Sequence, residues 1–244
     1  MSVEIEVIAA EAPARQALAF MLTDIEGSSA RWERFPTLMG RIIARHDALI
    51  TAAVAEAGGT VFKSTGDGLF ASFPTAHQAL HAAMAAQHAL AGLDTAAIDG
   101  LAVRIAIHIG AVEARGGDYF GPAMNRAARL LGIAHGGQIL LSEAAAEAAR
   151  PMLASDAALI CLGRHRLKDL IEAETVFQLR TPDLDQEFPA LRSLDARPNN
   201  LPRQASRFIG READGRAIAS LLRTHRLITL LGPGGIGKTR LSLQ

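Results

Sequence analysis

The sequence predicts an α+β protein in which helices pack on a mostly antiparallel sheet. Short apolar runs of strand length alternate with segments whose apolar residues recur at steps of three and four. Two of the apolar runs are joined by a tight glycine-containing turn, which is typical of a β-hairpin. Apolar residues make up 49% of the chain, so a buried core can form.

The chain opens with residues 1–16, which have no hydrophobic period and are expected to form a loose N-terminal leader. An apolar strand is predicted over 18–23 and delivers Asp24 at its end. A helical pattern follows over 30–57, interrupted once by a proline. An aspartate at a strand end suits a binding site, but Asp24 or Ser28 could instead cap the following helix.

The segment FKSTGDGLFASF, residues 62–73, is predicted to be a hairpin with an exposed tip. Lys63 and Asp67 lie near that tip. A carboxylate between two glycines can approach a metal ion or a phosphate without a bulky neighbour in the way. Taken alone, Gly-Asp-Gly is also a common turn, so the hairpin by itself does not decide between the two interpretations.

The remaining elements alternate between helical and strand patterns. We expect a helix over 75–93, a strand over 101–114, a helix beginning at Gly121 and Pro122, a strand over 138–141, a helix over 143–150, and a closing strand pair over 158–163 and 175–179. The resulting order, β-αα-ββ-α-β-α-β-α-ββ, fits a ferredoxin-like βαββαβ core.

A third polar set lies around the helix that begins at Pro122. Asp118 precedes this helix, and Asn125 and Arg129 are four residues apart and therefore share one of its faces. Two carboxylates on neighbouring strands can hold two divalent ions that activate a hydroxyl and stabilise a leaving phosphate. An arginine aimed at the same place would stabilise charge on phosphorus. A lysine and an aspartate can read the edge of a base.

These motifs, in this order, resemble those of the class III nucleotidyl cyclases over about residues 17–180. The matching segments are FMLTDIEGSSARWE, FKSTGDGLFASF, VRIAIHIGAV and GDYFGPAMNRAARL, with LGRHRLKDL as a weaker match near the end. The resemblance implies a cyclase fold and a site built from six side chains. It implies that Asp24 and Asp67 bind two Mg²⁺ or Mn²⁺ ions, that Lys63 and Asp118 read the adenine, that Asn125 positions the ribose, and that Arg129 stabilises the transition state.

The reaction implied by the resemblance is adenylate cyclase activity, the conversion of ATP to 3′,5′-cyclic AMP and pyrophosphate. The Lys63 and Asp118 pair favours ATP over GTP, because the guanine-preferring pattern replaces both. Family sites form between two subunits, so a homodimer with two sites is expected. The alternative is a weakly active or inactive cyclase-like domain that senses nucleotide as the input of an ATP-dependent transcriptional regulator.

The C-terminal part carries a separate motif. The segment GPGGIGKT, with Gly232, Gly237, Lys238 and Thr239, matches a P-loop and follows the apolar run 227–231, which we expect to be a strand. Glycines let backbone amides cradle phosphates, Lys238 would reach the terminal phosphates, and Thr239 would bind Mg²⁺. The chain stops five residues later. We therefore expect the start of a truncated P-loop NTPase domain over 207–244, after a proline-rich linker over 181–206.

Composition limits the partners and the compartment. The formal net charge is zero, so no strong case exists for binding nucleic acid or an acidic membrane surface. No signal peptide and no apolar stretch of membrane-spanning length is evident. The single cysteine, Cys161, allows no internal disulfide. A cytoplasmic protein is expected.

Overall fold

A computed structural model describes residues 16–184, 187–194, 210–233 and 236–242. The chain divides into two units, Met1–Arg197 and Pro198–Gln244, and each is described here by itself. The predicted leader, 1–16, lies almost entirely outside the described residues.

The first unit is built on one mixed sheet, with strands in the order β2-β3-β1-β4-β6-β8-β7 and β5 paired to β4. All described pairs are antiparallel except β4 with β6. The strands are β1 Gln16–Ile25, β2 Thr60–Ser64, β3 Leu69–Phe73, β4 Val103–Arg115, β5 Asp118–Phe120, β6 Ile139–Ser142, β7 Ala158–His165 and β8 Glu174–Arg180.

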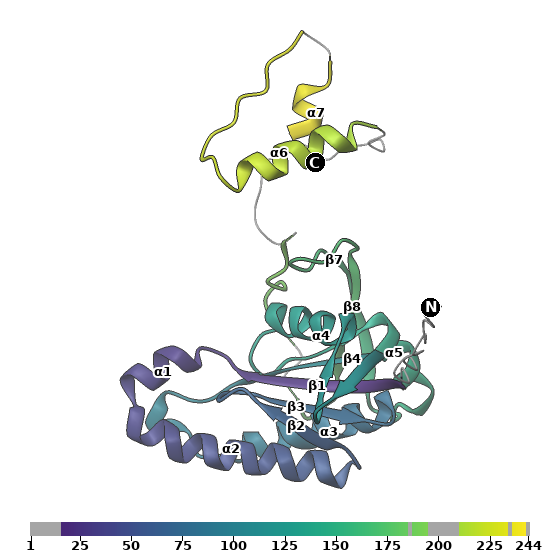
Figure 1. Cartoon of the computed structure of the whole chain (residues 1–244). Helices are drawn as coiled ribbons and strands as arrows, with labels where there is room; N and C mark the ends of the chain where they lie inside the picture. The colour runs from purple at the N-terminus through teal and green to yellow at the C-terminus, as the bar shows by residue number, and fades with distance from the viewer. Residues whose placement is uncertain (1–15, 185–186, 195–209, 234–235, 243–244) are drawn as a thin grey trace, which may run out of the picture. The chain divides into compact units, whose positions relative to one another are not determined.

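Helices cover both faces of this sheet, with α2 and α3 on one side and α4 on the other (Figure 1). One face carries β1 side chains such as Met21 against α2, α3 and α5, whereas the other carries Phe20 and Leu22 against α4. The alternation along β1 explains this division, since successive side chains of a strand point to opposite faces. The helices are α1 Ser28–Arg34, α2 Pro36–Glu56, α3 Ala76–Ala91, α4 Pro122–Ile133 and α5 Glu143–Ala149, with 3₁₀ turns at Ala96–Ile98 and Arg150–Met152.

The predicted class, helices packed on a mostly antiparallel sheet, is confirmed. The predicted helix break lies at the proline: α1 ends at Arg34 and Pro36 opens α2. The long strand expected over 101–114 is β4, and a turn at Gly116 and Gly117, both with positive φ, joins it to β5.

Part of the segment predicted as a linker, 181–206, instead packs on the first unit. Leu191 is 4% exposed and belongs to the core cluster on the α4 face. The Arg192 N–H donates to the Ile133 carbonyl, and the Ser193 hydroxyl contacts the imidazole of His165. A leucine among polar residues and prolines shows no period, so the sequence pattern missed this packed strap of residues 187–194.

The second unit contains two helices, α6 Glu212–Leu222 and α7 Lys238–Ser242. The strand expected over 227–231 is not formed: Leu227 and Leu231 are 84% and 89% exposed. A strand needs neighbours for its backbone hydrogen bonds, and the described residues of this unit supply none. Among the described residues, none of the helices is both long enough and apolar enough to span a membrane.

Candidate active site

The two predicted metal ligands meet where β1 ends beside the hairpin tip. The Ile25 N–H donates to the Asp67 carbonyl at 3.0 Å, and Thr23 exchanges two hydrogen bonds with Leu69 through its buried hydroxyl. Gly68 makes this approach possible, because a Cβ there would lie 2.0 Å from the Thr23 carbonyl oxygen. The glycine-flanked tip therefore brings the Asp67 backbone directly against the strand that carries Asp24.

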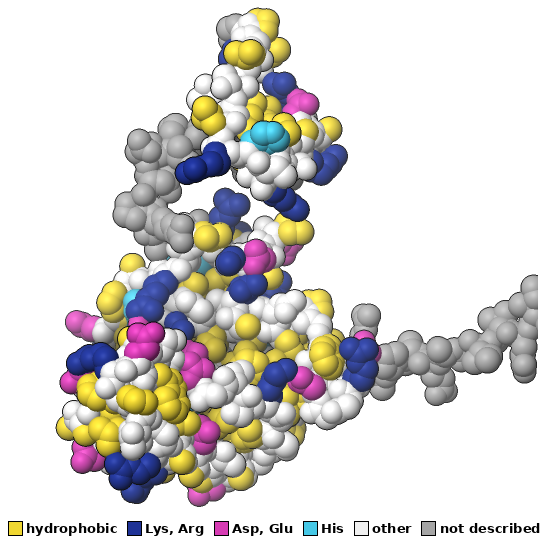
Figure 2. Space-filling model, turned by 60° about the vertical axis from the view of Figure 1, so that its left-hand side comes forward, with side chains coloured by type: hydrophobic (Ala, Val, Ile, Leu, Met, Phe, Trp, Pro, Cys, Tyr) yellow, Lys and Arg dark blue, Asp and Glu magenta, His cyan; other side chains and the backbone are white. Residues whose placement is uncertain are grey.

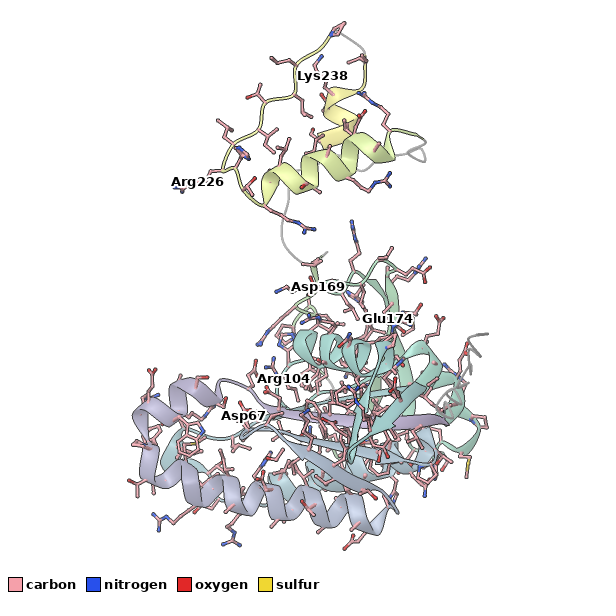
Figure 3. All side chains as sticks on the ribbon, viewed as in Figure 1. Asp67, Arg104, Asp169, Glu174, Arg226 and Lys238 are labelled. Atoms are coloured by element: carbon pink, nitrogen blue, oxygen red, sulfur yellow. The ribbon has the colours of Figure 1, made fainter. Side chains whose placement is uncertain are left out.

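Each aspartate uses one oxygen for an internal partner. The Arg104 guanidinium donates to Asp24 Oδ2 at 2.6 Å across the β1–β4 pairing, and the Ser28 hydroxyl donates to Asp67 Oδ2 at 2.5 Å. Asp67 and Arg104 are labelled in Figure 3. Burial raises the pKa of Asp24, with a further contribution from the nearby Asp67 charge, against the lowering effect of Arg104.

The helix-capping alternative for Asp24 and Ser28 is wrong. The N-cap of α1 is Gly27 in the left-handed region, with φ 69°, and no side chain caps that helix. The Ser28 hydroxyl is instead committed to Asp67. Both side chains therefore serve the carboxylate pair.

The donor set fits divalent cations such as Mg²⁺ or Mn²⁺. These ions prefer carboxylate oxygens, and each aspartate keeps its Oδ1 without a hydrogen bond among the described residues. Burial is the main cause that raises the Asp24 pKa, and the nearby Asp67 charge adds to it; a bound cation would offset both effects. In the described part of the chain, no group of three or more His, Cys, Asp or Glu side chains is placed to hold a metal, so the site offers a carboxylate pair only.

The predicted base-reading residues, Lys63 and Asp118, also meet. The Lys63 ammonium donates to Asp118 Oδ2 at 2.6 Å, although β2 and β5 are not neighbours in the sheet. An aromatic cluster holds the two strands together, since Tyr119 packs edge-to-face on Phe20 and Phe62. The hydrogen bond from Lys63 lowers the pKa of Asp118, so the carboxylate is ionised at neutral pH.

The third predicted set lies on α4. Pro122 begins the helix, its buried face carries Ala123, Ala127 and Leu130, and Asn125 and Arg129 lie exposed on the other side. The Arg129 guanidinium donates to Asp169 Oδ2 at 2.7 Å. Asp169 lies on the connection between β7 and β8 (Figure 3).

The chain thus brings the six residues into three groups: Asp24 with Asp67, Lys63 with Asp118, and Asn125 with Arg129. Among the described residues, no hydrogen bond or ion pair joins one group to another. A cavity of about 630 Å³ lies elsewhere, between β4 and the start of α4, and is lined by His108 and Arg126 but by none of the six. His108 is buried at 5% exposure, and its Nδ1 contacts the Ser142 hydroxyl at 2.7 Å.

Sequence reasoning missed three side chains that contact the predicted site residues. They are Arg104 and Ser28, which contact the aspartates, and Asp169, which contacts Arg129. The sequence contains a signal that could have singled out Arg104, because it is a charged residue within a mostly apolar strand. Asp169 lies within LGRHRLKDL, where basic side chains outnumber the single acidic one, and no predicted strand or helix contains it.

In the second unit, the P-loop residues show a partial match to expectation. Lys238 is the first residue of α7, and its ammonium donates to the carbonyls of Gly232 and Pro233 at 2.6 and 2.7 Å. Gly237 has a positive φ of 87°. The side chain of Thr239 is exposed.

Comparison with known proteins identifies the first unit. Residues 10–179 match the adenylate and guanylate cyclase catalytic domain family. The chain belongs to this family. An uncharacterised protein of Mycobacterium tuberculosis is 36% identical over 204 residues, covering 82% of this chain and 69% of the relative. An adenylate cyclase of Podospora anserina is 35% identical over 159 residues, covering 54% of this chain and 7% of the fungal protein.

Solved structures of this cyclase family share the fold. An adenylate/guanylate cyclase/hydrolase from Silicibacter pomeroyi is 34% identical with a TM-score of 0.62, covering 70% of this chain and all of that one. A Trypanosoma brucei adenylate cyclase in its monomeric state gives a TM-score of 0.65 at 25% identity, covering 72% of this chain and 92% of that one. The predicted cyclase catalytic domain is therefore confirmed at the level of family and fold.

Proposed function

We propose that this protein is an adenylate cyclase that converts ATP to 3′,5′-cyclic AMP and pyrophosphate. The observation that carries the proposal is the meeting of Asp24 and Asp67, two carboxylates with free oxygens at adjacent strand ends. The relatives named as adenylate cyclases support the same chemistry.

In this proposal Asp24 and Asp67 hold two Mg²⁺ or Mn²⁺ ions through their free Oδ1 atoms. The ions would supply Lewis-acid activation of the ribose 3′-hydroxyl and charge neutralisation on the leaving pyrophosphate. Arg104 and Ser28 keep the carboxylates in place through Oδ2. The aspartates therefore face the reacting phosphate already oriented, which is how a preorganised site lowers a barrier.

Lys63 and Asp118 would read the base. Held 2.6 Å apart, they present one donor and one acceptor side by side, which matches the N1 acceptor and N6 donor of adenine. Opening this pair to admit the base costs little, because Lys63 is 46% exposed and a solvated ion pair is weak. Specificity for ATP over GTP is part of the proposal.

Asn125 and Arg129 complete the set from one face of α4. Asn125 would hydrogen-bond the ribose, and Arg129 would donate to the α-phosphate as charge builds there during attack by the 3′-oxygen. The bond that forms joins O3′ to the α-phosphorus. The bond that breaks joins the α-phosphorus to the oxygen that bridges it to the β-phosphate, and pyrophosphate leaves.

We further propose that each site forms between two copies of the chain. The metal aspartates of one subunit would face the base-reading and α4 residues of its partner, which accords with the separation of the three groups within one chain. A twofold homodimer then contains two equivalent sites.

The direct test is product formation by the purified chain with Mn²⁺–ATP and, separately, Mn²⁺–GTP. We expect cyclic AMP from ATP and much less cyclic product from GTP. Asp67→Ala should lower the rate at least about 100-fold, because the bound metal ions lower the activation free energy by several kcal/mol.

The matched control is Asp156→Ala, which removes an exposed aspartate in the turn before β7 and should leave the rate unchanged. The proposal fails if the wild-type chain yields no cyclic nucleotide, or if Asp67→Ala is as active as Asp156→Ala. Equal rates with ATP and GTP would reject the adenine specificity alone.

For the second unit we propose the start of a P-loop NTPase domain that follows the cyclase domain. Support comes from the GPGGIGKT motif and from a helix that begins at Lys238. A cyclase fused to such a domain suits the alternative role as the nucleotide-sensing input of a larger regulator. Detectable turnover by the wild-type chain decides between an enzyme and a sensor that only binds.

A further inference from the structure

Arg129, the residue proposed to stabilise the transition state, is already engaged by a carboxylate of its own chain. Its Nη2 donates to Asp169 Oδ2 at 2.7 Å, and the side chains are 43% and 61% exposed. The guanidinium lies on α4, while Asp169 belongs to the β7–β8 connection, forty residues later in the chain. A phosphate that accepts from the same Nη2 donor must displace this carboxylate.

The position of Asp169 is set by the backbone of its turn. The Leu170 N–H donates to the Leu167 carbonyl, and Lys168 and Asp169 are the central residues of the turn. Leu167 is 1% exposed and fixes the turn to the core on the α4 face. Asp169 has φ 61°, in the left-handed region where glycine or asparagine is favoured over other residues.

The ion pair between Arg129 and Asp169 is weak enough to open and close reversibly. Both side chains reach solvent, and an exposed ion pair contributes little free energy. A single carboxylate oxygen accepts the bond, so the pair lacks the parallel double hydrogen bond of the strongest arginine–carboxylate contacts. A nucleotide phosphate offers more oxygens and more charge, and it can therefore displace the carboxylate.

We propose that Asp169 is a positioning residue that acts as a latch on Arg129. In the nucleotide-free chain it holds the guanidinium and competes with substrate phosphates for it, and substrate binding breaks the pair. The inference rests on the proposed function of Arg129. In the substrate complex the Arg129–Asp169 pair is already open. The free energy needed to open it therefore raises KM and leaves kcat unchanged.

The test replaces the carboxylate and preserves the turn. Asp169→Asn keeps a residue that tolerates a positive φ and removes the charge. We expect KM for Mn²⁺–ATP to fall about two- to five-fold, the range that an exposed ion pair supports, with kcat unchanged. The gain should shrink at high salt, because salt screens the exposed pair in the wild-type chain.

The chain offers a closely matched control in Asp99. This aspartate also has a positive φ, of 60°, is 59% exposed, and pairs with Arg34 at 2.8 Å. Asp99→Asn should change neither KM nor kcat. A fall in KM of equal size in both variants would mean a general charge effect and would overturn the latch.

A second comparison tests whether the effect passes through Arg129. The double variant Asp169→Asn/Arg129→Ala should bind nucleotide no better than Arg129→Ala alone. A gain that persists without the arginine, an unchanged or higher KM in Asp169→Asn, or a lower kcat would each reject the proposal.

Binding without turnover separates this inference from the proposed function. Calorimetric titration with Mn²⁺ and α,β-methylene ATP, which cannot lose pyrophosphate, should give a dissociation constant two- to five-fold lower for Asp169→Asn than for wild type. If the wild-type chain makes no cyclic AMP yet this difference appears, the function proposal fails and the latch stands. No difference in binding rejects the latch even in an active enzyme.

Discussion

At the scale of single residues, the candidate site is governed by side-chain partners. Asp24 and Asp67 are each tied through one oxygen, to Arg104 and Ser28, which leaves the other oxygen available. Burial, with a smaller contribution from the Asp67 charge, raises the Asp24 pKa, and a bound cation would favour the ionised form. Arg129 likewise has a partner of its own chain, because its guanidinium donates to Asp169.

His108 gives a residue-scale prediction about pH. Burial, with a contribution from Arg126, lowers its pKa to about 4, whereas the unfolded chain titrates near 6.5. The folded pKa is depressed, so the unfolded state binds more protons below pH 6.5 and stability falls between pH 6.5 and about 4. The free energy of unfolding should drop by about 2 kcal/mol between pH 7 and pH 5 from this group alone.

Urea denaturation of wild type and His108→Gln at the two pH values measures the contribution of this histidine. The variant should lose about that much of the pH dependence. An identical pH dependence in wild type and His108→Gln would contradict the assignment.

At the scale of elements, the site depends on how closely the β2–β3 hairpin approaches β1. The hairpin forms because two apolar runs flank a glycine-rich turn, and β3 then pairs with β1 from Ala19 to Leu22. The tip continues past that ladder, with the Thr23 hydroxyl bridging to Leu69. The distance between the aspartates is therefore set by backbone packing as well as by side-chain rotamers.

The substitution Gly68→Ala should move the tip of the β2–β3 hairpin away from β1. Its Cβ would lie 2.0 Å from the Thr23 carbonyl oxygen, so the tip has to shift away from β1. We expect a loss of about 1–3 kcal/mol in the free energy of unfolding and at least about a ten-fold fall in Mn²⁺-dependent rate. Urea denaturation and product assays check the two effects.

Gly40→Ala is the control for this substitution, because Gly40 lies within α2 with open space around the Cβ position. That change should leave the rate unaltered and slightly raise stability. A Gly68→Ala protein with wild-type rate would show that the approach of the tip is not required.

At the scale of the whole molecule, the first unit extends past the closing strand. The strap of residues 187–194 packs Leu191 into the core on the α4 face, and Arg192 pairs with Glu26 close to the candidate site. Basic and acidic side chains are intermixed on the face of this unit that Figure 2 shows, in keeping with a net charge of zero.

The shared-site proposal predicts rescue between two inactive chains. Equal amounts of Asp67→Ala and Arg129→Ala, co-refolded or co-expressed, should recover about a quarter of the wild-type specific activity. Half of randomly formed dimers are then mixed, and each mixed dimer keeps one intact site of two. Product assays at a fixed total concentration measure this recovery.

The control mixture combines Asp67→Ala with Asp24→Ala. Both substitutions lie in the metal half of the site, so every dimer has a defect in each site and no activity should return. Failure of the first mixture, or equal recovery in both, argues against sites formed between subunits.

Apart from the short strand β5, which was not predicted, the order and type of the elements in the first unit could be read from the chain, because apolar periodicity and turn residues are local signals. Pro36, the Gly-Asp-Gly tip and the Gly121–Pro122 helix start all lie where predicted. The strand expected over 227–231 failed, since a strand depends on neighbours that a local pattern does not contain.

The sequence alone determined the α+β class, the cyclase motifs and the identity of the six candidate residues, since each is carried by residue types at short spacing. Only the tertiary structure decided their partners: Arg104 for Asp24, Ser28 for Asp67, Lys63 for Asp118 and Asp169 for Arg129. These pairs join segments that lie far apart in the chain, up to eighty residues for Asp24 and Arg104. Strand register and packing create such contacts, and no local sequence signal encodes them.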